Sequence, residues 1–371
     1  MLGGSEIEAQ RVCKALIAKG HQVEVLCAGG DPMPPLKRWV DPAGVPVRLF
    51  GGNQNGAWRD YVYAWGVAWT LLKERGNYDF VYFLMQGLHL AVGLPVARLL
   101  GKPILMKVGG SNVIPLMAQS NIGRLELHWL RRWAYRVMLL NDGMVDEALA
   151  EGFERQQLLW MPNPVDVHDF APCSEAEKRR LREQFAVPEE ARVVVYVGRL
   201  SPEKGVDLLI ESFAPVAHRN PGSLLVLVGD GAQRKELEAL AKQLQLTPAQ
   251  IRFAGRVDPL TVRKWLQAGD IFSLVSPSEG FPCAVVEAMS VGLASVVSHI
   301  PANTQLIDQG EQGLLAPFGD REQIGAALEQ LLNDRAASLR MGTEARKRVI
   351  ERYSTEKVLD RYEDLFREMA G

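Results

Sequence analysis

The stretch Ser278-Glu279-Gly280-Phe281-Pro282-Cys283-Ala284-Val285-Val286-Glu287-Ala288-Met289 decides how this chain is interpreted. It follows an apolar run at residues 270–275 that is typical of a buried strand. Pro282 suits the first turn of a helix, where a missing N–H costs nothing. The stretch therefore predicts a strand, a tight turn and a helix.

The spacing of two carboxylates in this stretch is typical of residues on one side of a helix. Glu287 follows Glu279 by eight residues, which is about two helical turns, so both side chains can share one side of the helix. The helix start offers N–H groups to an anion, and the carboxylates can accept hydrogen bonds from hydroxyls. A phosphate joined to sugars would satisfy both. By itself, the stretch leaves open a plain helix with an acidic first turn.

The totals describe a globular protein of ordinary charge. A length of 371 residues suggests two domains, and 47% hydrophobic residues suffice for packed cores. Lys and Arg number 42 against 44 Asp and Glu, a formal net charge of -2. This balance gives no reason to expect nucleic acid as a partner. Any anion site must be local.

The cysteines and the apolar runs indicate the part of the cell in which the protein resides. The four cysteines form no Cys-x-x-Cys pair, which argues against a disulfide framework or a structural zinc site. Apolar runs are shorter than the ~20 residues of a membrane span. The first six residues also lack the regions of a signal peptide. We therefore expect a cytoplasmic protein with no membrane-spanning segment.

Strand-like runs alternate with helical patterns through both halves of the chain. We expect strands at 22–27, 45–50, 80–84, 104–108, 137–140, 158–161, 193–197, 224–228, 251–253, 271–275, 295–298 and 313–315. Such alternation predicts mostly parallel sheets with helices on both faces. The proline-rich residues 161–172 separate the halves. We place domains at 1–168 and 169–353, followed by a final helix at 354–371.

The start of the chain is unusual for this architecture. Gly3-Gly4-Ser5-Glu6 looks like the glycine turn and helix start that follow a strand, yet only two residues precede it. The first strand of the N-terminal domain is therefore expected to be missing. A central strand's absence would expose the edges of its neighbours.

A turn rich in charge follows the first strand of the second half. Residues 198–205 carry Arg199 and Lys204 around a turn at the strand's carboxyl end. Arg offers a planar fork and Lys a point charge, a suitable clamp for a diphosphate. Each such charged hydrogen bond contributes about 1.5–3 kcal/mol. A solvated loop with ordinary surface charge is the alternative.

Two further turns carry glycines at strand ends. Gly229-Asp230-Gly231 allows a ligand or backbone to approach closely. Residues 253–258, which include Val257, could form one wall of a pocket for a nucleotide base. A simple connecting loop is an equal alternative for residues 253–258, and Gly229-Asp230-Gly231 is weak evidence by itself.

The four turns, in this order, resemble the family 4 retaining glycosyltransferases. Those proteins have the GT-B fold, in which two Rossmann-like domains face each other. The matching residues are 198–200 with 203–205, 229–231, 253–255, the Glu279 to Glu287 pair (Glu-x7-Glu), and in the first half 3–6, 20–23 and 162–166. The resemblance covers nearly the whole chain and is stronger in its second half.

The resemblance implies roles for individual residues. Arg199 and Lys204 would hold the donor's diphosphate, Glu287 the ribose hydroxyls and Glu279 the transferred sugar. The complete implied donor site is Arg199, Lys204, Glu279, Gly280, Phe281, Pro282, Glu287, Val257, Gly231 and Gly4, with Glu279, Arg199 and Lys204 as the catalytic residues. The family needs no metal or other cofactor, since positive side chains and a helix start stabilise the departing nucleotide.

The implied activity is retaining transfer of a sugar from a nucleotide-sugar donor to an acceptor hydroxyl. The first domain would bind a sugar or lipid-linked acceptor and the second domain the donor, in synthesis of cell-surface polysaccharide or glycolipid. The final helix would pack back toward the first domain. Two alternatives are a noncatalytic nucleotide-sugar-binding protein with a defective N-terminal domain, and a nucleotide-sugar epimerase.

The chain departs from the family in its first half. Besides the missing strand, residues 107–112 lack a histidine that many members have near the position of Gly109. Of the six histidines, only His89 is placed to face the cleft between the domains. No catalytic base is nominated.

Two predicted helices are rich in aromatic residues. One carries Trp58, Tyr61, Tyr63, Trp65 and Trp69, and the other carries Arg124, His128, Trp129, Arg131, Arg132, Trp133 and Arg136. We expect the rings to pack on the sheet and the arginines to face water. The alternative is a peripheral contact with the cytoplasmic face of a membrane that carries a lipid-linked acceptor.

Overall fold

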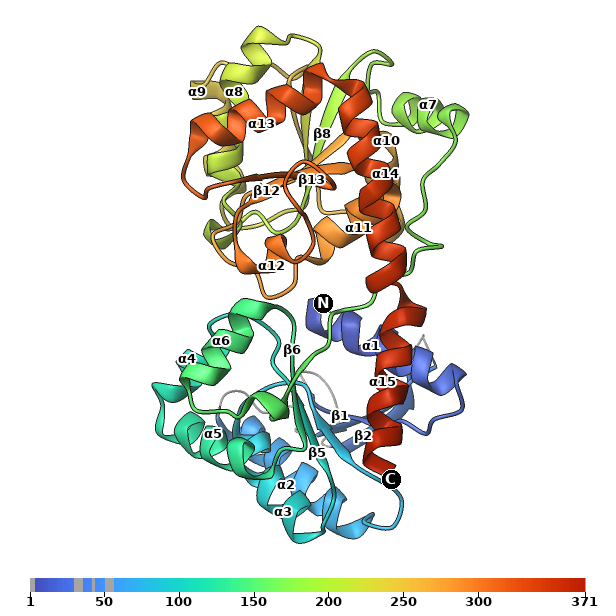
Figure 1. Ribbon diagram of the computed structural model, residues 1–371, viewed down its shortest axis with the longest axis vertical. Helices are drawn as coiled ribbons and strands as arrows, with labels where there is room; N and C mark the ends of the chain where they lie inside the picture. The colour runs from blue at the N-terminus through green and yellow to red at the C-terminus, as the bar shows by residue number, and fades with distance from the viewer. Residues whose placement is uncertain (1–3, 30–35, 42–43, 51–56, 371) are drawn as a thin grey trace. The chain divides into compact units, whose positions relative to one another are not determined.

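Buried aliphatic runs form a six-stranded parallel sheet in the second half of this computed structural model (Figure 1). The structure describes residues 4–29, 36–41, 44–50 and 57–370. The strands are β8 (Arg192–Val197), β9 (Ser223–Val228), β10 (Ile251–Gly255), β11 (Ile271–Leu274), β12 (Ala294–Ser298) and β13 (Gly313–Ala316). Their order is β10-β9-β8-β11-β12-β13, and every neighbouring pair is parallel. The predicted α/β fold with parallel strands is confirmed.

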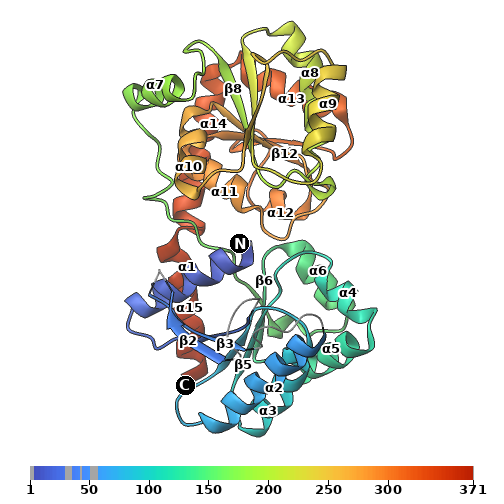
Figure 2. The same ribbon diagram turned by 180° about the vertical axis from the view of Figure 1, so that it is seen from behind.

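Helices cover both faces of this sheet (Figures 1 and 2). One face carries α8 (Val206–Arg219), α9 (Arg234–Gln243) and α13 (Arg321–Asn333). The other face carries α10 (Pro259–Ala268), α11 (Cys283–Val291) and α14 (Arg335–Arg352). The remaining elements are α7 (Glu175–Gln184), which packs on α10, the short α12 (Pro301–Thr304), and the 3-10 turn η2 (Pro202–Lys204). This is a doubly wound unit.

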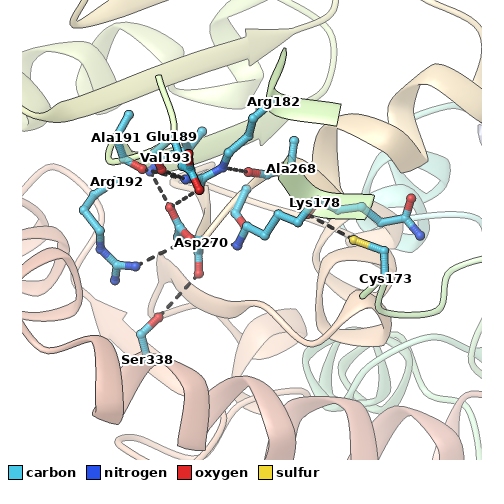
Figure 3. A network of polar contacts seen from close by, with 12 residues as sticks. Cys173, Lys178, Arg182, Glu189, Ala191, Arg192, Val193, Ala268, Asp270 and Ser338 are labelled. Atoms are coloured by element: carbon cyan, nitrogen blue, oxygen red, sulfur yellow. Dashed lines mark hydrogen bonds and ion pairs between the residues drawn. The ribbon is translucent and has the colours of Figure 1, made fainter. Parts of the chain in front are cut away.

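A buried carboxylate ties the amino-terminal edge of the sheet together (Figure 3). Asp270 precedes β11 and accepts hydrogen bonds from Lys178 Nζ (2.8 Å), Arg182 Nη2 (2.7 Å) and the Val193 amide (2.8 Å). Arg192 lies 3.5 Å away. Burial alone would raise the pKa of Asp270, but Lys178 and Arg182 outweigh it and hold the pKa below its usual 3.8. The network joins α7 to the starts of β8 and β11.

The chain divides into two compact units, residues 165–357 and residues 1–164 together with 358–371. The former contains the sheet described above. In the latter, one sheet is parallel throughout and consists of β4 (Val81–Phe83), β5 (Ile104–Lys107), β6 (Arg136–Leu139) and β7 (Leu158–Trp160). The other sheet has the order β1-β3-β2 and consists of β1 (Val25–Ala28), β2 (Leu36–Val40) and β3 (Pro46–Phe50). β2 runs antiparallel to β3 and was not predicted.

The described residues of this unit begin with α1 (Gly4–Ala18), so they contain no strand ahead of this helix. Gly3, part of the predicted glycine turn, lies outside the described residues. Within the described residues, the pairings of β1, β2 and β3 are separate from those of β4 to β7. The predicted role of this unit in binding the acceptor stays a prediction.

The last helix of the sequence completes the core of this unit. Residues of α15 (Thr355–Ala370) pack with α1, β5 and β6 in one apolar cluster, whose buried members are Val12, Leu16, Leu105, Met138, Met161, Val358, Leu359, Tyr362 and Leu365. The hydroxyls of Tyr82 and Tyr362 lie 3.1 Å apart. Ser354 Oγ accepts from the Lys357 amide at 3.3 Å and caps the start of this helix.

The opposite side of the four-stranded sheet carries further helices. They are α2 (Ala57–Lys73), α3 (Leu88–Leu99) and α5 (Asn121–Trp133), with α4 (Val113–Ala118), α6 (Asp142–Ala150) and the 3-10 turn η1 (Arg155–Gln157) beside them. No helix in the described part of the chain combines the length and apolarity needed to cross a membrane.

Four of the five aromatic rings of α2 contradict our prediction that they pack on the sheet. Tyr63 agrees with it, since it is half-buried and its hydroxyl donates to the Leu26 carbonyl oxygen of β1 at 2.9 Å. Trp58, Tyr61, Trp65 and Trp69 are 63%, 48%, 66% and 67% exposed. The buried face is formed instead by small and aliphatic residues, Ala64, Val67, Ala68 and Leu71. The helix therefore has two apolar faces, and the smaller side chains allow close packing on α3 and β3. In α5 the rings of Trp129 and Trp133 stack and are half-buried.

Candidate active site

The strand order creates a switch point at the carboxyl ends of β8 and β11. From β8 the chain winds toward β9 and β10, and from β11 it winds the other way toward β12 and β13. Loops leaving two neighbouring strands in opposite directions form the place where doubly wound sheets bind ligands. The predicted clamp loop, 198–205, follows β8, and the Glu279 turn follows β11. The fold thus brings these two motifs to one edge.

Glycines let the loops at this edge touch through their backbones. Gly229 has φ 144°, and a Cβ there would lie 1.8 Å from the Gly198 carbonyl oxygen. A Cβ on Gly231 would lie 2.2 Å from the Leu200 carbonyl oxygen. The Leu200 amide in turn donates to the Asp230 carbonyl oxygen at 3.1 Å. The loops after β8 and β9 are therefore fixed against each other, which requires glycine at both positions.

A third glycine joins the clamp loop to β11. Gly205 lies in the left-handed region, with φ 61°, at the start of α8. A Cβ there would lie 2.4 Å from the Val275 carbonyl oxygen. The close approach places the residue before it, Lys204, next to the turn that follows β11.

Lys204 and Glu279 form a direct ion pair at the switch point. Lys204 Nζ donates to both carboxylate oxygens of Glu279, at 2.7 and 3.0 Å. The side chains are 23% and 8% exposed. The sequence assigned these residues to different parts of the donor and did not predict their contact. Because the two side chains are largely shielded from water, their electrostatic interactions with a bound ligand are less weakened by solvent.

Arg199 is more open to solvent than Lys204. Its guanidinium is 3.6 Å from Glu203 and its side chain is 71% exposed. Its carbonyl oxygen accepts a hydrogen bond from the buried Tyr196 hydroxyl at 2.8 Å. Burial, and then the nearby Glu279 and Glu203, raise the pKa of Tyr196, so this hydroxyl stays protonated and anchors the loop. The diphosphate role of Arg199 stays a prediction.

The helix of the deciding stretch begins one residue later than expected. Pro282 is buried and stands directly before α11, and its carbonyl oxygen accepts from the amides of Val285 (2.9 Å) and Val286 (3.2 Å). The ring of Phe281 lies 5.9 Å from that of Tyr353. Glu287 is half-buried in the second turn of α11. Gly280 lies between Glu279 and this helix start.

The remaining predicted donor residues are divided between the two compact units. Val257 is half-buried between β10 and α10, and Gly231 follows β9. Gly4 belongs to the other unit, where it is the first residue of α1. The loops after β8, β9, β10 and β11 therefore share the carboxyl edge of one sheet. Their contacts with a nucleotide sugar stay predictions.

Arg234 is a residue at this edge that the sequence analysis did not select. Its guanidinium pairs with Asp230 (3.8 Å) and Glu238 (2.9 Å). It also lies 3.2 Å from the position of a Cβ on Gly255. Arg234 thus bridges the loops after β9 and β10. The signal was its place at the first turn of the helix after Gly229-Asp230-Gly231.

His89 packs among aromatic rings of its own unit. His89 is in α3, and its ring packs 4.9 Å from Tyr63 and 6.4 Å from Phe83. Burial lowers the pKa of this imidazole and favours its neutral form. Among the described residues, no three His, Cys, Asp or Glu side chains gather in a way that could hold a metal ion.

Known proteins resemble this chain along its whole length. Residues 3–164 match the model of the glycosyl transferase 4-like domain, and residues 177–348 match that of the glycosyl transferases group 1. N-acetyl-alpha-D-glucosaminyl L-malate synthase of Bacillus anthracis is 21% identical over 369 residues, 98% of this chain and 94% of that protein. UDP-Gal:alpha-D-GlcNAc-diphosphoundecaprenol alpha-1,3-galactosyltransferase of Escherichia coli is 26% identical over 310 residues, 81% of this chain and 78% of that protein.

Solved structures show the same fold. The crystal structure of HepE from Anabaena, in complex with UDP and glucose, superposes with a TM-score of 0.80 at 20% identity. The superposition covers 99% of this chain and 96% of HepE. This likeness confirms the predicted GT-B fold. With its two matched regions and the ordered motifs around Lys204 and Glu279, the chain belongs to the group 1 glycosyl transferases, the glycosyltransferase family 4-like proteins.

Proposed function

We propose that this glycosyltransferase moves a sugar from a uridine diphosphate sugar to an acceptor hydroxyl, with retention at the anomeric carbon and without a metal ion. The observation that carries the proposal is the Lys204–Glu279 ion pair at the switch point between β8 and β11. Uridine is favoured because the solved HepE structure holds UDP and the Escherichia coli relative is named for UDP-Gal. Retention and independence of metal follow from the family resemblance.

Lys204 is suited to stabilising the departing diphosphate. Its ammonium group has three N–H donors, of which two point to Glu279 oxygens. The third N–H can reach a phosphate oxygen, since the side chain is 23% exposed. As the sugar–phosphate bond breaks, negative charge grows on the diphosphate and the fixed ammonium stabilises it. Arg199, five residues earlier in the same loop, would add a second positive charge.

The two carboxylates are suited to hydroxyl groups. A carboxylate oxygen can accept more than one hydrogen bond, so a sugar hydroxyl can donate to Glu279 beside Lys204. Its 8% exposure makes a sugar hydroxyl that replaces water a favourable partner. Glu287, in the second turn of α11, would receive the ribose hydroxyls. In this way the pair would orient the donor by both its sugar and its nucleoside.

The acceptor is proposed to be a sugar or a lipid-linked sugar at the cytoplasmic face of a membrane. The Escherichia coli relative is named for an acceptor on diphosphoundecaprenol. A relative from Rhizobium meliloti is named for lipopolysaccharide core biosynthesis. A role in cell-surface polysaccharide or glycolipid synthesis would follow.

Calorimetric titration of the purified chain with UDP, GDP and ADP tests the site. We expect UDP to bind best, and Lys204→Met to weaken it about 10- to 100-fold, because one charged hydrogen bond of about 1.5–3 kcal/mol is lost. Glu287→Gln should weaken UDP in the same direction. Arg219→Ala is the matched control. Arg219 lies at the opposite end of α8 from Lys204, where it forms an exposed ion pair with Glu329. Equal affinity in Lys204→Met, Glu287→Gln and the control would refute the site.

Transfer is tested separately with UDP-glucose and UDP-galactose on a panel of lipid-linked and free sugars. Glu279→Gln should slow transfer more than it weakens UDP, because it faces the sugar. Proton NMR of the product should show the donor's anomeric configuration, and EDTA should leave the rate unchanged. UDP binding without transfer to any acceptor would favour a noncatalytic protein. Conversion of the donor sugar in the absence of acceptor would favour an epimerase.

A further inference from the structure

An aromatic stripe runs along the solvent side of α2. It consists of Trp58, Tyr61, Trp65, Trp69 and Leu72, all exposed. At 100° per residue these five positions fall within an arc of about 80° on the helix surface. The opposite side of the helix is buried against α3, β1 and β3. Figures 1 and 2 show α2 beside α3 on the outside of its unit.

The stripe is flanked by positive charge. Lys73 and Arg75 are exposed at its carboxyl end. The single carboxylate of α2, Asp60, stands about 160° around the helix from Trp58 and pairs with Arg59 at 3.3 Å. Glu74 is engaged by Arg48 at 2.9 Å. The apolar surface therefore has basic rather than acidic neighbours on its own face.

The end of α3 adds to the same basic region. Tyr78 links α2 to the residues after α3, because its hydroxyl donates to the Leu71 carbonyl oxygen (2.9 Å) and its own carbonyl accepts from Lys102 Nζ (2.5 Å). The neighbouring residues Arg98 and Leu99 at the end of α3 are exposed, Leu99 to 84%. Asp79 is an exposed acid at this end. Together, the exposed residues Lys73, Arg75, Arg98 and Asp79 carry a net positive charge.

The size and composition of the stripe fit a lipid surface better than a protein partner. A large aromatic side chain covers about 150–250 Å², so the stripe offers on the order of 500 Å². A stable protein interface needs about 800 Å² from each partner. The stripe is one helix wide and about 25 Å long. Trp and Tyr are the residues enriched where a bilayer meets water, and Lys and Arg meet anionic headgroups.

We infer that α2 docks this glycosyltransferase on an anionic bilayer, with the aromatic stripe inserted at the depth of the headgroups and with Lys73, Arg75 and Arg98 against the lipid phosphates. The helix lies parallel to the surface and does not span it. This contact is separate from the Lys204–Glu279 site. It needs neither donor nor acceptor to form.

The test is sedimentation of the full chain with vesicles, in the absence of nucleotide and sugar. Vesicles of phosphatidylcholine alone are compared with vesicles that contain one third phosphatidylglycerol. We expect binding to the anionic vesicles, a blue shift of tryptophan emission, and quenching by lipids brominated near the headgroup. Binding should weaken as salt rises, because the headgroup attraction is screened.

Three double variants separate the contributions. Trp65→Ser with Trp69→Ser should weaken binding at least tenfold, since two inserted rings are lost. Lys73→Gln with Arg75→Gln should weaken binding to the anionic vesicles about fivefold per charge and leave binding to neutral vesicles unchanged. The matched control is Leu260→Ser with Leu339→Ser, two similarly exposed apolar residues of the other unit, which should bind as the wild type does.

Several outcomes would overturn the inference. These are no binding of the wild type to anionic vesicles, equal binding of the Trp65/Trp69 variant, or equal loss in the Leu260/Leu339 control. Light scattering tests the other occupant. If the wild type is a dimer that does not bind vesicles, and the Trp65/Trp69 variant is a monomer, the stripe is the contact with a second copy of the chain. UDP titration on the same samples keeps this test apart from the proposed function, because the stripe variants should retain UDP affinity.

Discussion

Replacing Asp270 by Asn should destabilise residues 165–357 without changing the donor site. The substitution keeps the side-chain shape but removes the charge that faces Lys178 (2.8 Å), Arg182 (2.7 Å) and Arg192 (3.5 Å). The pair of Asp270 and Arg182 is shielded from water, with side chains 8% and 9% exposed. Breaking such a buried pair leaves uncompensated charges and typically costs about 3–5 kcal/mol.

The structure places the expected cost near the lower end of this range. Arg182 also donates to three carbonyl oxygens, and Lys178 donates to that of Gly269, so neither loses all its partners. We therefore expect a loss of about 3 kcal/mol in the free energy of unfolding. For a unit of this size that corresponds to about 6–12 °C in Tm.

Differential scanning calorimetry, with hydrogen exchange of peptides from β8 and β11, measures this loss. Asp169→Asn is the control, because Asp169 pairs with Arg263 while 70% exposed, and we expect a change within about 1 kcal/mol. The folded pKa of Asp270 is depressed, so its stabilisation is complete above the unfolded pKa, near 3.8, and disappears as pH falls below it. A Tm of Asp270→Asn at pH 7 within 2 °C of the wild type would refute this reasoning.

Two further predictions concern other positions. Burial raises the pKa of Glu126 from 4.5 to about 7, so the free energy of unfolding should fall as pH rises through this interval, by on the order of 3 kcal/mol. Urea unfolding should show that Glu126→Gln removes this loss, and an unchanged pH profile would count against it. Gly229→Ala should lower Tm and UDP affinity together, because its Cβ would lie 1.8 Å from the Gly198 carbonyl oxygen, whereas Gly222→Ala has open space and should do neither.

Sequence patterns predicted the second half of the fold more fully than the first. The strands β8, β9 and β11 are mostly apolar and are buried on both faces, a pattern typical of central strands in a parallel sheet. The strand β2, Leu-Lys-Arg-Trp-Val, mixes charge with apolar residues and pairs antiparallel with β3, so neither alternation nor a buried run identified it. Its place depends on a partner strand rather than on its own pattern.

The site shows the same limit. Motif order selected Lys204 and Glu279, which lie 75 positions apart, but only the parallel pairing of β8 with β11 makes them neighbours. Similarly, α2 carries an aliphatic face and an aromatic face at helical spacing, and periodicity cannot tell which one is buried. The small residues Ala64 and Ala68 decide it, because they let α3 approach closely.

The packing of α15 has a consequence for synthesis on the ribosome. Residues 165–357 are continuous in the sequence, so that unit can fold as soon as its last strand and helices have emerged. The unit translated first must wait, because Val358, Leu359, Tyr362 and Leu365 of its core are translated only after residues 165–357. Until then Val12, Leu16 and Leu105 stay without these neighbours. The unit that begins translation should therefore be the later one to mature.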